Sequence, residues 1–597
     1  MALSRVGAVI FIWLINFADN LNLRRLSSQK VSLKKPVSRP VNRSGRPGKV
    51  LYPPFIVLAC DLRQAGRFGR QGGGRHHLDQ YGSFFINSHL SDGRDYTIGM
   101  NNPFIEQPSG KQSTPFPASS PLKILLILPA GERVRVTLAN PEVPHRAMLR
   151  FSVLPLTVVA ALTPREHEVR IVDENVEPLD YDTDCDVVGI TFMTALAPRA
   201  YEIATEFRRR GRVVVGGGYH ATLCPEDAAP HFDALVLGDA EGAWESLLAD
   251  FQRARMQKIY RQPEGLMPGS FVRPECLQTP VPRRDLLAHT ARHYATVNAV
   301  QAGRGCRHNC RYCSVTVFHG RKYRHRPVAA VIAELQPLSR HFIFVDDNII
   351  AEREYALELF RAMVPLRKRW VSQCSILIAD DAELLQAARA AGCCGLFIGV
   401  ETASEANLAA MNKQFNHTGS YAERLRKIRR AGIGVVAGMI VGMDADSQEV
   451  FDRTLKFLEK TCIDVVQLNI LTPLPGTPLY QDVEGTGRIT DRDWSHYDYR
   501  HVVFQPVRMT AEELQAGADW LYAQFYRLDR ILWRFARAVL TVGWLPALLG
   551  LKLGLTYRYD NRREQIVGWN PARARLTPVV RRQWIPTKVA GARNLAV

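Results

Sequence analysis

Two series of short apolar runs, separated by helical patterns, constrain the fold of this 597-residue chain more than any other feature of its sequence. One series occupies residues 121–250 and the other residues 285–510. Apolar runs of about four to eight residues that alternate with helices are typical of parallel strands, because a parallel connection needs a crossover and its helices bury both faces of the sheet. The sequence therefore predicts an α/β protein with two parallel sheets.

The first series predicts a Rossmann-like sheet over residues 121–250. Sheets of this kind bind ligands in the crevice outside the carboxyl ends of their strands. After it, residues 251–284 contain five prolines, which predict a linker with little regular structure. The strands of the sheet are expected at 123–128, 169–173, 187–191, 213–215 and 234–237, and its helices at 155–162 and 200–210.

The second series contains six strands with helices between them, which suggests a (βα)6 partial TIM barrel over residues 285–510. In such a barrel the chemistry lies at the C-terminal ends of the strands. Residues 511–597 predict a helical, basic C-terminal extension that starts with a helix over 511–523. The barrel strands are expected at 296–301, 342–346, 370–376, 396–400, 434–441 and 465–471, and the helices at 328–335, 353–363, 382–391, 421–431 and 449–458.

The distribution of charge argues against a partner that is a nucleic acid. The chain has a formal net charge of +19, but residues 1–120 contribute +10 and residues 521–597 contribute +11. The part between them is therefore close to neutral, and a polyanion-binding body is disfavoured. Residues 1–120 are basic and punctuated by glycine and proline, and we expect a disordered or poorly structured N-terminal extension there.

The most specific motif is Cys306-x3-Cys310-x2-Cys313, which follows the first predicted barrel strand. The chain has 11 cysteines without paired spacings, which favours a reducing compartment over a disulfide scaffold. Three thiolates on one short loop suit an iron–sulfur cube, because they ligate three irons and leave the fourth open. Incidental buried thiols and zinc are the alternatives, although structural zinc requires four ligands. Cys393 and Cys394 are expected to be packing thiols.

With this motif at its head, the second series resembles the barrel of the radical S-adenosylmethionine (SAM) enzymes, and the resemblance covers roughly residues 285–510. It implies a 4Fe–4S cluster on the three cysteines, with SAM chelated to the open iron. Polar or glycine-rich segments follow the later strands in the order that this family has. By this resemblance, the residues that contact SAM are Tyr312, Asp346, Asp347, Gly399, Glu401, Gly438, Ile440 and Pro473.

The first series resembles the cobalamin-binding Rossmann-like domain that precedes the barrel in one large subgroup of these enzymes. The segments that carry the resemblance include Val215–His220 and Gly238–Glu241. Glycines at strand ends let a sheet accept a large flat ligand in its crevice. By this resemblance, the residues that contact cobalamin are Thr194, Gly216, Gly217, Gly218 and Glu241.

One departure from corrinoid proteins concerns the ligand of cobalt. The D-x-H-x-x-G motif that supplies a cobalt-binding histidine in many of them is absent. His145 and His220 are the nearby imidazoles, and a lone histidine is more often structural than a ligand. Many members of the radical subgroup also lack the motif, so cobalamin remains the expected cofactor. A degenerate domain that is kept for packing or for substrate is the alternative.

The subgroup includes hopanoid methylases, tetrapyrrole ring methylases and the anaerobic magnesium-protoporphyrin ester cyclase. The resemblance therefore implies a C-methyltransferase that acts on an unactivated carbon of a hydrophobic or secondary-metabolite substrate, such as an isoprenoid lipid or a tetrapyrrole. It also implies an electron donor such as flavodoxin or ferredoxin. An oxidative cyclase without methyl transfer is one alternative. A corrinoid- or cluster-binding sensor without turnover is an alternative of another class.

Residues 531–557 form an apolar segment with arginines at its rims. Segments of this kind lie in the headgroup region of a membrane, whereas Pro546 and Lys552 argue against a membrane crossing. We therefore predict a cytoplasmic protein with peripheral contact to the inner face of the membrane. A helical pair docked on the barrel is the alternative.

Overall fold

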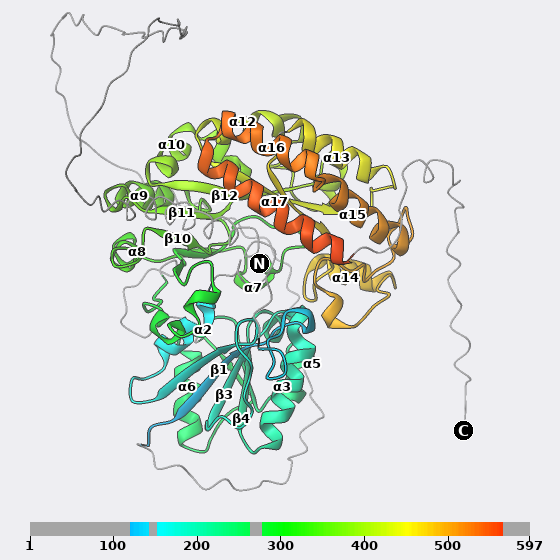
Figure 1. Cartoon of the computed structure of the whole chain (residues 1–597). Helices are drawn as coiled ribbons and strands as arrows, with labels where there is room; N and C mark the ends of the chain where they lie inside the picture. The colour runs from blue at the N-terminus through cyan, green and yellow to red at the C-terminus, as the bar shows by residue number, and fades with distance from the viewer. Residues whose placement is uncertain (1–119, 142–151, 263–276, 462, 565–597) are drawn as a thin grey trace, which may run out of the picture. The chain divides into compact units, whose positions relative to one another are not determined.

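The structure of the protein, a computed structural model, describes residues 120–141, 152–262, 277–461 and 463–564 (Figure 1). The N-terminal extension predicted for residues 1–120 lies outside the described residues, apart from Ser120. The described chain contains two parallel sheets, as the sequence predicts, and each has six strands; two further short strands form an antiparallel pair.

The first sheet is Rossmann-like and has the strand order β2-β1-β3-β4-β5-β6. Its order reverses at β1, which pairs with β2 on one side and β3 on the other, so a crevice is expected outside the carboxyl ends of β1 and β3. The sixth strand lies inside residues 251–284, where we predicted little regular structure; it is only three residues long and pairs with β5. The strands are β1 Lys123–Leu128, β2 Glu168–Asp173, β3 Val187–Thr191, β4 Val213–Gly217, β5 Ala234–Leu237 and β6 Ile259–Arg261.

Helices cover both faces of this sheet. Helix α3 (Ala197–Arg209) buries Ala200, Ile203 and Phe207, which recur at the spacing of an amphipathic helix. Helices α2 (Leu154–Leu162) and α6 (Ala243–Gln252) contribute to a separate hydrophobic core that includes Trp244. The short helices α4 (Tyr219–Leu223) and α5 (Pro225–Ala228) follow β4.

The second sheet has the order β14-β13-β12-β11-β10-β7, so its strands lie side by side in the order of the chain, as in a partial barrel. Its main strands are buried almost throughout, which is why they read as continuous apolar runs. The strands are β7 Ala299–Val300, β10 His341–Phe344, β11 Arg369–Cys374, β12 Cys393–Glu401, β13 Gly434–Val441 and β14 Val465–Ile470. The helices between them are α7 Ser314–His319, α8 Val328–Leu335, α9 Arg353–Met363, α10 Ala382–Ala390, α11 Glu405–Ala410, α12 Tyr421–Arg430 and α13 Val450–Lys460, and α14 Pro478–Gly485 follows β14.

Three helices complete the described chain: α15 (Ala511–Phe525), α16 (Leu528–Thr541) and α17 (Trp544–Glu564). The hydroxyl of Tyr526, at the end of α15, accepts a hydrogen bond from the N–H of Val466 and donates one to its carbonyl, so it covers part of the free edge of β14. Leu549 and Leu553 of α17 are fully buried in the barrel core. The structure thus has the docked helical pair that we gave as the alternative for residues 531–557. Among the described residues, no helix combines the length and the hydropathy that a membrane crossing requires.

Candidate functional site

The cysteine loop begins at a short strand, β8 (Gly303–Gly305), which pairs with β9 (Tyr323–His325), and it ends at the start of α7. Two carboxylates that follow β10 fix its backbone. Asp346 accepts hydrogen bonds from the N–H groups of Ala302 (3.0 Å) and Gly303 (2.6 Å), and Asp347 accepts one from Gly305 (2.8 Å). Burial raises the pKa of Asp346 to about 7, and these two N–H donors offset part of that shift.

Cys306, Cys310 and Cys313 line one cavity of about 170 Å³ at the C-terminal ends of the barrel strands. Among the described residues, no group of three or more histidine, cysteine, aspartate or glutamate side chains is placed to hold a metal ion. Burial raises the pKa of Cys306 to about 11 and that of Cys310 to about 12, so both thiols are protonated at neutral pH until a metal displaces the proton.

The same cavity offers polar atoms that suit the amino-acid end of a ligand. Oδ1 of Asp347 and Oε1 of Gln373 are buried, line the cavity side by side with the cysteines, and have no hydrogen-bond partner among the described residues. Buried acceptors without a partner are costly unless a ligand supplies the donor. The residues present therefore fit a cluster on three thiolates with an amino acid bound beside it.

A buried ion pair forms another part of the cavity wall. Nζ of Lys413 lies 2.5 Å from Oε1 of Glu401 and donates a hydrogen bond to the hydroxyl of Tyr312 (3.2 Å). Burial lowers the pKa of Lys413, but the Glu401 carboxylate outweighs this effect, so the pKa is raised and the ammonium stays charged. Glu401 has a φ of +70°, which is strained for a residue with a side chain, and a Cβ on Gly399 would collide with its carboxylate.

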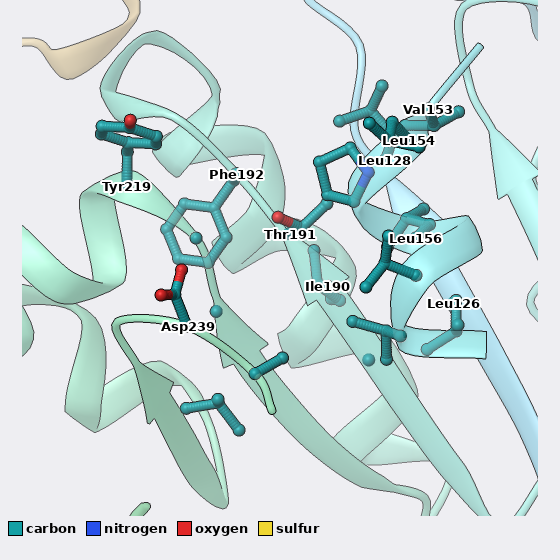
Figure 2. Close-up of a pocket in the computed structure, with 18 of the residues that line it drawn as sticks. Leu126, Leu128, Val153, Leu154, Leu156, Ile190, Thr191, Phe192, Tyr219 and Asp239 are labelled. Atoms are coloured by element: carbon teal, nitrogen blue, oxygen red, sulfur yellow. The ribbon is translucent and has the colours of Figure 1, made fainter. Parts of the chain in front are cut away.

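A second cavity, of about 400 Å³, lies at the carboxyl ends of the strands of the Rossmann-like sheet. Figure 2 shows the apolar side chains of Leu126, Leu128 and Leu156 on one side of it, and Tyr219 and Asp239 on the other. Gly216, Gly217 and Gly218 also line it, as does Gly238, on which a Cβ would project into open space. A largely apolar crevice at the reversal of strand order, with glycines in its wall, fits a large flat cofactor.

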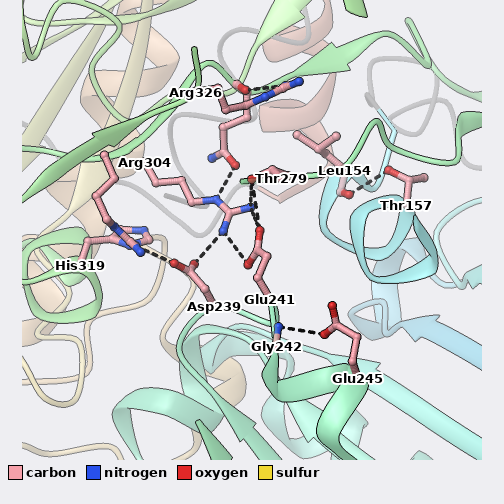
Figure 3. Close-up of polar contacts among 12 residues, drawn as sticks. Leu154, Thr157, Asp239, Glu241, Gly242, Glu245, Thr279, Arg304, His319 and Arg326 are labelled. Atoms are coloured by element: carbon pink, nitrogen blue, oxygen red, sulfur yellow. Dashed lines mark hydrogen bonds and ion pairs between the residues drawn. The ribbon is translucent and has the colours of Figure 1, made fainter. Parts of the chain in front are cut away.

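Figure 3 shows a polar network beside this second cavity that joins the loop after β5 of the Rossmann-like sheet to the short strand β8. The guanidinium of Arg304, two residues before Cys306, lies 3.0 Å from Oδ1 of Asp239 and 2.8 Å from Oε1 of Glu241. Arg324 also pairs with Asp239 at 2.6 Å. Burial raises the pKa of Asp239, but the two arginines outweigh it and hold the pKa below its usual value. The loop after β5 is thereby tied to the strand that leads into the cysteine loop.

Most of the predicted residues line the cavities, but three do not. The side chain of Asp346 binds backbone N–H groups instead, and Leu471, Thr472 and Leu474 line the first cavity where we expected Pro473. Thr194 is buried against His220, and Thr191 lines the second cavity. The predicted residues that line a cavity are Cys306, Cys310, Tyr312, Cys313, Asp347, Gly399, Glu401, Gly438 and Ile440 for the first, and Gly216, Gly217, Gly218 and Glu241 for the second.

The histidines weighed as cobalt ligands and the two cysteines expected to be packing thiols have structural environments where they are described. His220 is fully buried and hydrogen-bonded to Asp227 (3.0 Å) and Tyr201 (3.1 Å), and His145 lies outside the described residues. Cys393 and Cys394 are buried in the barrel core, as packing thiols are.

Sequence reasoning missed several residues that line the cavities. Asp239 lies inside the Gly238–Glu241 segment and Arg304 lies two residues before Cys306, so their charge beside these motifs was the available signal. Lys413 and Gln373 had no such signal, because nothing in their local sequence indicates which way they face.

Comparisons with known proteins agree with this geometry. The family model of the Radical SAM superfamily matches residues 300–458, and that of the B12 binding domain matches residues 149–248. Over 74% of this chain and all of the other, the fold is similar to that of the radical SAM methyltransferase TsrM from Kitasatospora setae, solved with cobalamin and a 4Fe–4S cluster, with a TM-score of 0.54 and 16% identity.

Three curated relatives are methyltransferases by name. Bacteriochlorophyllide d C-12(1)-methyltransferase of Chlorobaculum tepidum is 28% identical over 66% of this chain and 87% of its own length. Hopanoid C-2 methylase of Rhodopseudomonas palustris is 30% identical over 57% of this chain and 65% of its own length. An uncharacterised methyltransferase of Synechocystis is 30% identical over 63% of this chain and 72% of its own length. The chain therefore belongs to the radical SAM enzymes that carry a B12-binding domain, and its cofactors are a 4Fe–4S cluster, SAM and cobalamin.

Proposed function

We propose that this enzyme is a C-methyltransferase that acts on an unactivated carbon of a hydrophobic substrate of the polycyclic isoprenoid or tetrapyrrole class. The relatives named above act on a bacteriochlorophyllide and on a hopanoid by name. Bacteriochlorophyllides and hopanoids are both large and mostly apolar ring systems. We therefore propose a substrate with this shared character.

The observation that carries the proposal is the closeness of the two cavities. Arg304 lines the second cavity and Cys306, two residues later, lines the first. His319 of the second cavity has Nε2 at 3.9 Å from Oδ2 of Asp347, which lines the first. Transfer of a methyl group to a substrate radical requires both centres to reach the same carbon, and only adjacent cavities allow this.

The bound cofactors supply the hydrogen-abstracting radical and the methyl group, while the chain positions them and excludes water. In our proposal the three thiolates hold the cluster, and Asp347 and Gln373 accept hydrogen bonds from the amino group of SAM. The ion pair of Glu401 with Lys413 lies at the strand ends, where we propose that Glu401 contacts SAM. The glycines of β4 and the Gly238–Glu241 loop hold the corrinoid.

Replacing Glu401 by alanine should weaken SAM binding while it leaves the cluster in place. A charge-assisted hydrogen bond contributes about 1.5–3 kcal/mol, which corresponds to roughly a 10- to 100-fold change in affinity. Isothermal titration with SAM under anaerobic conditions measures the affinity, and visible absorbance measures the cluster. The matched control is Glu423→Ala, which removes an exposed glutamate that forms an ion pair with Lys427 within α12. An affinity equal to that of the parent would refute the role of Glu401.

Product analysis tests the reaction itself. The anaerobically reconstituted enzyme, with a reduced flavodoxin or ferredoxin and a panel of isoprenoids and tetrapyrroles, should form 5′-deoxyadenosine and S-adenosylhomocysteine in equal amounts with the methylated substrate. One SAM supplies the radical and a second restores the methyl group, which fixes this ratio. 5′-Deoxyadenosine without S-adenosylhomocysteine would instead identify a non-methylating radical enzyme. Formation of neither product on reduction would favour a sensor.

A further inference from the structure

Large apolar side chains that face solvent gather on the C-terminal helices. Of the twelve such side chains among the described residues, six belong to α16 and α17. Trp533 is 67% exposed, Leu540 is 86% exposed and Trp544 is 61% exposed, and no other tryptophan among the described residues belongs to this exposed group. The six are Leu528, Leu532, Trp533, Leu540, Trp544 and Leu555.

The helical phase of α16 explains why exposed apolar side chains of this helix share one face. Its inner face is made by Ile531, Arg534 and Ala538, which are buried at the spacing of one helix face. Leu532, Trp533, Ala536 and Leu540 lie on the opposite face and are exposed. A surface helix of a globular protein normally has polar residues there. We call the exposed side chains Leu532, Trp533, Leu540 and Trp544 the C-terminal ridge.

The positive charge of the C-terminal region favours an anionic partner for the ridge. Residues 521–597 have a net charge of +11, and the sequence that follows α17, residues 565–597, contains six basic residues and no acidic one. Arg530 and Arg537 of α16 form ion pairs with Glu459 (2.6 Å) and Asp464 (3.8 Å), respectively. A second copy of the chain on this ridge would bring two strongly basic segments together, whereas an anionic lipid surface complements them.

We propose that the C-terminal ridge docks on the surface of an anionic lipid bilayer. Trp533 and Trp544 are placed to lie at the level of the headgroups, where amphipathic rings are favoured, and Leu532 and Leu540 enter the boundary of the acyl chains. The helix lies in the plane of the interface while its inner face stays packed on the barrel. This docking does not depend on the reaction that we propose, although it would place the enzyme where apolar ring systems dissolve.

The test is flotation of the full chain with vesicles of phosphatidylcholine alone or of phosphatidylcholine with phosphatidylglycerol. We expect the parent to float with the anionic vesicles and much less with the neutral ones. The double variant Trp533→Ser with Leu540→Ser should lower its partition by at least 10-fold. Both side chains are exposed, so the variant should fold, which a circular dichroism spectrum checks. Truncation near Tyr526 would be a poorer test, because it removes Leu549 and Leu553 from the core.

The matched control is the double variant Val281→Ser with Val507→Ser, which removes exposed apolar side chains elsewhere (61% and 58% exposed) and should float like the parent. A parent that does not float with anionic vesicles would overturn the proposal, as would undiminished flotation of the ridge variant. Self-association of the parent in sedimentation, abolished in the ridge variant while flotation is unchanged, would assign the ridge to a second copy instead. SAM cleavage in solution should be the same in all these variants, so a failure here is distinct from a failure of the proposed reaction.

Discussion

Replacing Cys310 by alanine is expected to abolish both the visible absorbance of the cluster and the cleavage of SAM. Cys310 is 8% exposed and lines the first cavity together with Cys306 and Cys313. A cluster with two thiolates in place of three loses a ligand of one iron, and the site has no further cysteine on the same loop to replace it. The measurements are the absorbance spectrum and the iron content after anaerobic reconstitution, and the yield of 5′-deoxyadenosine on reduction.

A second thiol distinguishes loss of the cluster from general damage. Cys185 is also buried, at 1% exposure, but it lies in the core of the Rossmann-like sheet and lines neither cavity. Cys185→Ala removes a sulfur of similar burial and should retain the cluster and the cleavage of SAM. Full cleavage activity in Cys310→Ala would rule out our assignment of the cluster to these three cysteines.

Replacing Arg304 by alanine is expected to destabilise the protein and to weaken cobalamin binding. The substitution removes the arginine that pairs with Glu241 and one of the two that pair with Asp239, and these carboxylates are only 14% and 8% exposed at their side chains. Removing one member of a buried ion pair costs about 3–5 kcal/mol. Arg304 and both carboxylates line the second cavity, so the loss of the positive charge also changes the wall that faces the corrinoid.

Urea unfolding and cobalamin retention after gel filtration measure the two effects, and Arg304→Lys should restore part of the stability because it keeps the charge without the fork geometry. Arg209→Ala is the control, since Arg209 is 67% exposed and its pair with Glu206 contributes about 0–1 kcal/mol.

The folded-state pKa of Asp239 is depressed, so its contribution to stability is present above the unfolded-state pKa and is lost as the pH falls through the folded-state pKa. Arg304→Ala should reduce this acid sensitivity, and unchanged stability and retention would contradict the role of the network.

The sequence by itself determined the features that depend on neighbouring residues. An apolar run such as Gly434–Val441 is buried on both faces, so its composition alone indicates a central parallel strand. The cysteine loop is equally local, because the spacing between Cys306 and Cys313 sets which metal centre it can hold. The order of strands and helices then follows from the chain, since crossovers in parallel sheets are short and of one hand.

Only the tertiary structure decided which side chains meet. Asp346 and Asp347 are adjacent in sequence, yet one binds the backbone of the cysteine loop while the other lines the cavity, and the path of the chain after β10 makes that choice. Lys413, which follows α11, meets Glu401 at the end of β12, and Arg304 meets Glu241 from 63 residues away. Packing of one face of α16 against the rest of the protein decides which of its apolar side chains remain exposed. A local pattern fixes the conformation of a segment, whereas contacts between distant segments depend on how the folded elements pack, and the polar network between the two cavities is made of such contacts.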